Sequence, residues 1–161
     1  MNPSPPTVLI LWQNLRSKVM KQVPMGSTMA KRLTKALRGK RRWVGLAVSP
    51  EHQTRSSLDS VLSQLGDTLD TPRPFRLMEF HSSNESIAEQ SRTKMADEAI
   101  ETPPSCGFAI VQVPLETIKG VRALLARERS YEDIGCMSLT TSGKIRLVRE
   151  RLHLPKPTRK R

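Results

Sequence analysis

The sequence is poor in the residues that build a disulfide scaffold or stack on bases. Its 161 residues include two cysteines, two Trp, one Tyr and three Phe. Cys106 and Cys136 are too few for a disulfide framework and lack the spacing of a zinc site. Because only 37% of the residues are hydrophobic, we expect one modest core in a single domain of ordinary size.

Long apolar runs are also missing. The longest one near the amino terminus, residues 8–12, is far shorter than the roughly 20 residues of a membrane helix. Basic residues follow this run instead of preceding it, which disfavours a secretory signal. No membrane association is therefore predicted. A mitochondrial presequence is an alternative to a cytosolic or nuclear location, because the amino terminus is basic and free of acids.

Catalytic and nucleotide-binding motifs do not occur in the sequence: there is no Walker loop, glycine-rich dinucleotide motif, zinc-protease motif or nucleophile elbow. His52, His81 and His153 fall near the ends of expected elements, without partners at ligand spacing. The adjacent Glu132 and Asp133 are more typical of a solvated turn than of an acid–base pair. We expect no active site, metal ion or cofactor in the chain itself.

Charge is abundant and unevenly placed, with a net charge of +12. Residues 1–50 contain ten Lys/Arg and no acids, and residues 143–161 contain eight Lys/Arg and one acid. Residues 51–142 contain nine Lys/Arg and fourteen acids. Clustered cations displace the counterions that condense on phosphates. This segregation favours a nucleic-acid partner over two solvated tails or an anionic membrane.

Hydrophobic periodicity predicts an alternation of short strands and helices. We expect strands at 43–48, 75–80, 107–113 and 134–139, and helices at 58–65, 115–125 and 143–152. This order predicts an α+β fold: a ferredoxin-like, RNA-recognition-motif-like β-α-β-β-α-β sandwich with helices on one face of the sheet and an extra C-terminal basic helix.

The expected domain spans residues 37–154. Residues 1–36 are predicted to be a basic, partly disordered extension, and residues 155–161 a basic tail. Residues 84–105 are rich in Ser, Glu and Asn and show no sustained apolar stripe. We predict a polar insertion or long loop there.

The strand at 106–113 partly matches the base-stacking strand of an RNA recognition motif. Cys106 replaces its usual basic residue, and Ile110 and Val113 replace two of its aromatic residues. With Phe108 as the one remaining aromatic, base stacking on the sheet is expected to be poor. RNA contact should then depend on cations that bind phosphates and recognise shape.

Two basic segments supply the candidate RNA-binding residues. In the second, Ser142 is expected to cap the last helix and Gly143 to let backbone amides approach a phosphate, although the pair also suits a simple turn. The candidates are Lys35, Arg38, Lys40, Arg41 and Arg42 in the first segment, and Ser142, Gly143, Lys144, Arg146, Arg149 and Arg151 in the second.

Three segments together resemble the ribonuclease P protein component 2 family, the small α+β subunit of archaeal ribonuclease P and of the eukaryotic ribonuclease P and MRP complexes. They are the basic lead-in 37–43, with Trp where Tyr is common, the strand and helix at 107–125, and residues 142–146, with Lys144 where Thr is usual. The resemblance covers 37–83 and 106–154 in the same order and spacing.

The resemblance implies a non-catalytic subunit that helps a catalytic RNA to remove 5′ leaders from precursor tRNA. The implied partners are ribonuclease P RNA, precursor tRNA and the barrel-like component 3 subunit, with Mg²⁺ at the RNA active site. It also implies a cytoplasmic location in an archaeon, and a nuclear or nucleolar one in a eukaryote. A ribosome-associated or other basic RNA-binding scaffold is the alternative function, and an independent nuclease is disfavoured by the residue inventory.

Overall fold

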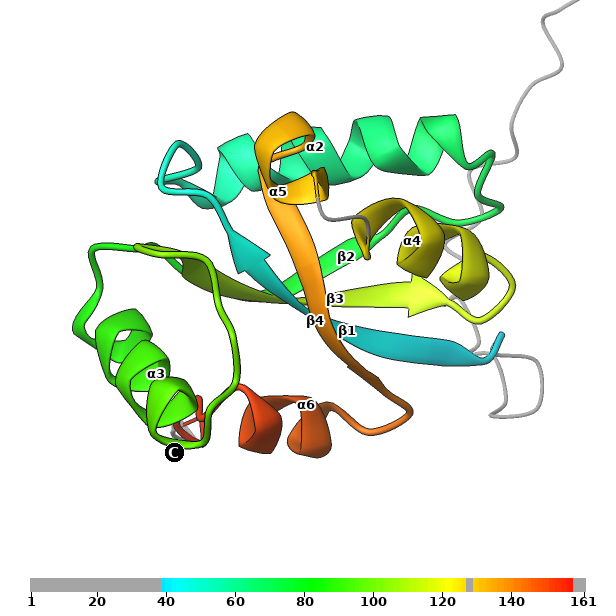
Figure 1. Ribbon diagram of the computed structural model, residues 1–161. Helices are drawn as coiled ribbons and strands as arrows, with labels where there is room; N and C mark the ends of the chain where they lie inside the picture. Colours follow the sequence, from blue (N-terminus) through cyan, green and yellow to red (C-terminus); the bar gives the residue numbers. More distant parts are fainter. Residues whose placement is uncertain (1–38, 127–128, 158–161) are drawn as a thin grey trace, which may run out of the picture. The chain divides into compact units, whose positions relative to one another are not determined.

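The computed structural model describes residues 39–126 and 129–157, which form a four-stranded sheet with helices on both faces (Figure 1). The predicted extension at 1–36, with Lys35, and the neighbouring Arg38 lie outside the described residues. None of the described helices is both long enough and apolar enough to cross a membrane. In chain order the elements are β1 (Arg41–Val48), α2 (Arg55–Thr68), β2 (Arg76–His81), α3 (Ser86–Asp97), β3 (Gly107–Pro114), α4 (Ile118–Leu125), α5 (Ser130–Asp133), β4 (Cys136–Ser142) and α6 (Ile145–Arg151).

The sheet is antiparallel throughout, with the strand order β2-β3-β1-β4. β1 is paired along its whole length with β3: Arg41 pairs with Pro114 at one end, and Val48 pairs with Gly107 at the other. On its other side β1 pairs with β4, with an irregularity after Gly45. The predicted α+β class is confirmed, and each of the four predicted strands is observed near its expected position.

The first face of the sheet is covered by α2 and α4, as the periodicity of their sequences predicts. Leu58, Leu62 and Leu65 on α2 lie at positions i, i+4 and i+7, on one side of the helix. They belong to the same buried apolar cluster as Val44 and Leu46 of β1. The helix begins after Thr54, whose hydroxyl accepts a hydrogen bond from the Ser57 amide at 3.3 Å.

The second face is covered by α3 and α6, so the prediction of helices on one face is wrong. Met95 of α3 and Val148 of α6 share a buried cluster with Phe108 and Ile110 of β3. The long-loop interpretation of residues 84–105 is also wrong, although the segment does lie between β2 and β3. The apolar stripe of α3 escaped detection because its buried residues include Ala88, which is small, and a serine.

Gly45 allows α6 to lie directly on β1. A Cβ atom at this position would lie 2.8 Å from Leu152 Cδ1, 2.9 Å from Thr140 Cγ2 and 3.0 Å from Val148 Cγ1. These separations are below normal van der Waals contact, and both Val148 and Leu152 are fully buried. A side chain at residue 45 therefore competes with the docked position of α6.

We expect Gly45→Ala to destabilise the domain by about 1–3 kcal/mol, as overpacking of a filled core usually does. Gly66→Ala in α2 is the matched control, because the nearest atom to its new Cβ is Thr71 Oγ1 at an ordinary 3.4 Å. That change should stabilise the domain by about 0.5–1 kcal/mol through helix propensity. Urea unfolding followed by circular dichroism measures both values, and equal effects of the same sign would contradict the packing argument.

Candidate nucleic-acid interface

Strand pairing brings the two predicted RNA-binding segments together. The first residues of β1 lie beside the last residues of β4, and Trp43 pairs with Ser142. A Cβ atom on Gly143 would lie 3.1 Å from Arg42 Nη1, so the Arg42 side chain packs against the turn that follows β4. Segments about 100 residues apart in the chain thus form one surface.

Two arginines that are not among the candidates predicted from the sequence, Arg73 and Arg76, lie at the same end of the sheet. Gln112 of β3 pairs with both Trp43 of β1 and Arg76 of β2, so Arg76 belongs to the same row across the sheet. The Arg73 guanidinium lies against Gly39. We call the set the basic cluster: Lys40, Arg41, Arg42, Arg73, Arg76, Lys144 and Arg146.

The basic cluster is open to solvent. All its members are exposed except Arg42, which is partly buried. Within the described residues, Arg146 is its one member in an ion pair, at 3.6 Å from Glu150. That pair is surface-exposed, with 74% of the Arg146 side chain accessible, and contributes little stability. The cations of the cluster are therefore available to phosphate groups.

The opposite end of the sheet is acidic. There β1 and β2 end while β3 and β4 begin, with Val48 paired to both Gly107 and Cys136. The connections at that end, residues 49–54, 82–85, 98–106 and 134–135, contain no Lys or Arg. They contain Glu51, Glu85, Glu98 and Glu101, and the short helix α5 adds Glu132 and Asp133. These connections thus carry acids and no Lys or Arg of their own, although Arg92 of α3 donates hydrogen bonds to the carbonyls of Ser83 and Cys106 within them.

Arg149 does not join the basic cluster. Its guanidinium donates to Glu79 Oε1 of β2 through Nε at 2.6 Å and through Nη2. Only 19% of the Arg149 side chain and 20% of the Glu79 side chain are exposed. The ion pair connects α6 to β2, which lies at the opposite edge of the sheet from β4. This contact leaves Arg149 poorly placed to bind RNA.

The turn before α6 also differs from its predicted role. Lys144 occupies the N-cap position of α6, and no side chain caps the helix. The Ser142 hydroxyl instead accepts a hydrogen bond from the Lys144 amide at 3.2 Å, so the prediction of Ser142 as N-cap is wrong. Arg151 is exposed but donates to Thr140 Oγ1 at 3.0 Å and to the Thr141 carbonyl at 3.3 Å. Its hydrogen bonds attach the end of α6 to β4.

The face of the sheet that an RNA recognition motif uses for stacking is closed here. Phe108 and Ile110 are both 0% exposed, beneath α3 and α6. Figure 1 shows these two helices side by side below the sheet, opposite α2 and α4. A base has no access to Phe108 while the two helices are docked. Contacts by the basic cluster therefore remain as the route to a nucleic acid.

The two cysteines are placed for packing. Cys106 and Cys136 are both buried and free. Burial raises the pKa of the Cys106 thiol to about 11 and that of the Cys136 thiol to about 12. Both thiols are therefore protonated at neutral pH, which makes them poor nucleophiles. In the described ranges no three His, Cys, Asp or Glu side chains come together as ligands for a metal ion.

Comparisons of the chain with protein-family models, with curated proteins and with solved structures found no match. The resemblance to ribonuclease P protein component 2 therefore remains a prediction that depends on the motifs themselves.

Proposed function

We propose that this chain is an RNA-binding, non-catalytic subunit of ribonuclease P that helps the catalytic RNA to remove 5′ leaders from precursor tRNA. The observation that carries the proposal is the pairing of β1 with β4. It unites Arg42 with the Ser142–Gly143 turn and builds one cationic surface from the two segments on which the family resemblance is strongest.

The basic cluster suits recognition of an RNA backbone. Each cation that neutralises a phosphate releases condensed counterions, which favours binding without reading the base sequence. Recognition of backbone shape is typical of folded RNA, and it agrees with the closure of the sheet face over Phe108.

In this proposal the fold is the ferredoxin-like sandwich, with α3 inserted between β2 and β3 and α6 added after β4. The protein contributes positioning and charge, while Mg²⁺ and the chemistry of cleavage belong to the RNA. The barrel-like component 3 subunit is the proposed protein partner. The location follows the lineage, cytoplasmic in an archaeon and nuclear or nucleolar in a eukaryote.

Reconstitution tests the proposal. Precursor-tRNA cleavage is measured with ribonuclease P RNA and the other protein subunits, in the presence and absence of this chain. We expect the chain to increase cleavage at limiting Mg²⁺, because added cations reduce phosphate repulsion within the assembly. No effect in a mixture that is otherwise complete and active would exclude the proposed role.

The RNA that co-purifies with the chain separates this function from the alternative. Enrichment of ribonuclease P RNA supports the proposal. Enrichment of ribosomal RNA would instead assign the same basic cluster to a ribosome-associated scaffold. The pure chain without added RNA should leave precursor tRNA intact, which distinguishes both functions from an independent nuclease.

A further inference from the structure

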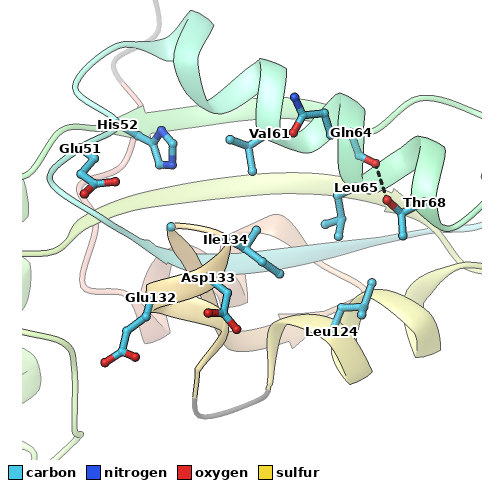
Figure 2. Close-up of a pocket in the computed structure, with 11 residues that line it drawn as sticks. Glu51, His52, Val61, Gln64, Leu65, Thr68, Leu124, Glu132, Asp133 and Ile134 are labelled. Carbon is cyan, nitrogen blue, oxygen red and sulfur yellow. Dashed lines mark hydrogen bonds between the residues drawn. The ribbon is translucent and has the colours of Figure 1, made fainter.

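A groove with apolar walls lies between α2 on one side and α4 and α5 on the other (Figure 2). Its volume is about 440 Å³, within the range of pockets that bury a ligand or an anchoring side chain. The apolar walls come from Val61 and Leu65 of α2, Leu124 of α4 and Ile134 at the end of α5. Val61, Leu124 and Ile134 are only partly buried, so the groove presents apolar surface to solvent.

One end of this groove is acidic. Glu51 and Glu132 lie toward the same end in Figure 2, Asp133 follows Glu132 and lies below Ile134, and Leu124 and Thr68 lie toward the other end. All three acids are exposed, and none of them forms an ion pair with another described residue. The three carboxylates therefore create a locally negative potential on a chain whose net charge is +12.

His52 at the acidic end is held in place by its neighbours. Its Nδ1 atom lies 2.8 Å from the Ser57 hydroxyl, and its ring packs against Gly135. Gly135 has a φ of +79°, a left-handed conformation that glycine adopts readily. The end of the groove is therefore preorganised, which lowers the entropic cost of binding there.

We propose that this groove docks a cationic amphipathic segment of a partner protein. An apolar side chain of that segment enters between Val61, Leu65, Leu124 and Ile134, and a neighbouring Lys or Arg lies toward Glu51, Glu132 and Asp133. Apolar anchors surrounded by complementary charge are the usual composition of such sites. A nucleic acid is a poor occupant, because three carboxylates would face its phosphates.

This surface is separate from the basic cluster. The acids of the groove belong to the end of the sheet where β1 ends and β4 begins, and the basic cluster to the end where β1 begins and β4 ends. The domain can thus bind RNA and a basic protein segment at the same time. The inference does not depend on which RNA the basic cluster binds.

Binding of synthetic peptides to the full chain tests the inference. The main probe is a helical peptide of about 14 residues, roughly four turns, with Leu on one face and Lys on the other. Two further probes replace every Leu by Ser or every Lys by Glu. Fluorescence anisotropy at about 0.15 M salt, where the Debye length is about 8 Å, should show saturable one-site binding of the Leu/Lys peptide and much weaker binding of the other two.

Matched variants locate the site. The triple change Glu51→Gln, Glu132→Gln and Asp133→Asn should weaken binding of the Leu/Lys peptide at least about tenfold, on the scale of interfacial charge pairs. The control Asp59→Asn, Asp67→Asn and Asp70→Asn removes the same charge elsewhere and should change the affinity less than about twofold. In α2, Gln64→Lys in the groove wall should weaken binding, whereas Ser63→Lys beside it should not.

Three outcomes would overturn the inference. They are no saturable binding of the Leu/Lys peptide, equal losses in the two triple variants, and equal affinity for the Ser/Lys peptide. The last two would show diffuse attraction between charges instead of a groove. Circular dichroism confirms that each variant is folded, and RNA binding should be unchanged in the groove variant because its three acids lie away from the basic cluster.

Discussion

Replacing Arg41 and Lys144 together by Gln is expected to weaken RNA binding about 10- to 30-fold near 0.15 M salt. Both side chains are exposed, and both residues lie at the same end of the β1–β4 pair: Arg41 precedes Trp43 by two residues, and Lys144 follows its partner Ser142 by two residues. Each lost phosphate contact should reduce the slope of log K against log salt by about 0.7–0.9. The measurement is filter binding or anisotropy over a series of salt concentrations.

The matched control replaces Lys94 of α3 and Arg122 of α4 by Gln. These two cations are also exposed, and their replacement removes the same total charge, but they lie outside the basic cluster. The control should leave the salt slope almost unchanged, because a distant exposed charge is screened within about one Debye length. If both double variants lose affinity and slope equally, RNA binds through net charge alone and the basic cluster is not its site.

Replacing Arg149 by Met is expected to destabilise the domain by about 2–3 kcal/mol. The change removes the charge but keeps a long apolar side chain, and it leaves Glu79 without its partner when only 20% of that side chain is exposed. Breaking a buried ion pair costs about 3–5 kcal/mol, because the remaining charge is poorly solvated. Partial exposure of this pair reduces the expected value, which urea unfolding measures.

The double variant Arg149→Met with Glu79→Gln separates the ion pair from simple packing. It leaves no uncompensated charge and should recover most of the lost stability. Arg146→Met, on the exposed side of α6, is the control and should change stability by less than about 0.5 kcal/mol. Full destabilisation in the double variant would show that Arg149 acts through packing and not through Glu79.

Arg146 and Arg149 look alike in the sequence, but the structure gives them different surroundings. Arg146 and Arg149 stand three residues apart in one basic helix, and both are reasonable RNA contacts on charge alone. The fold leaves Arg146 exposed and turns Arg149 toward Glu79, 70 residues earlier in the chain. Helical spacing cannot reveal this difference, because the partner of Arg149 comes from a strand at the far side of the sheet.

The helix α3 shows why part of the fold was not predicted. Its buried residues are Ala88, Ser91 and Met95, of which only Met95 is large and apolar. Ser91 is nevertheless 0% exposed, and its hydroxyl donates to the His153 carbonyl at 3.4 Å. The helix is thus stabilised by a partner segment at the carboxyl end of the domain, which local periodicity does not contain.

The sequence by itself determined the strands, the helices α2 and α4, and the position of positive charge near both ends of the chain. These properties depend on neighbours within about four residues or on composition, so they can be read locally. Only the tertiary structure decided that β1 and β4 pair, that Arg73 and Arg76 join the basic cluster, and that α3 and α6 close the second face over Phe108. These features depend on strand register and on packing between residues far apart in the chain. Many strand pairings satisfy the same local sequence pattern, and the observed one is the pairing that buries the apolar side chains in a closely packed interior.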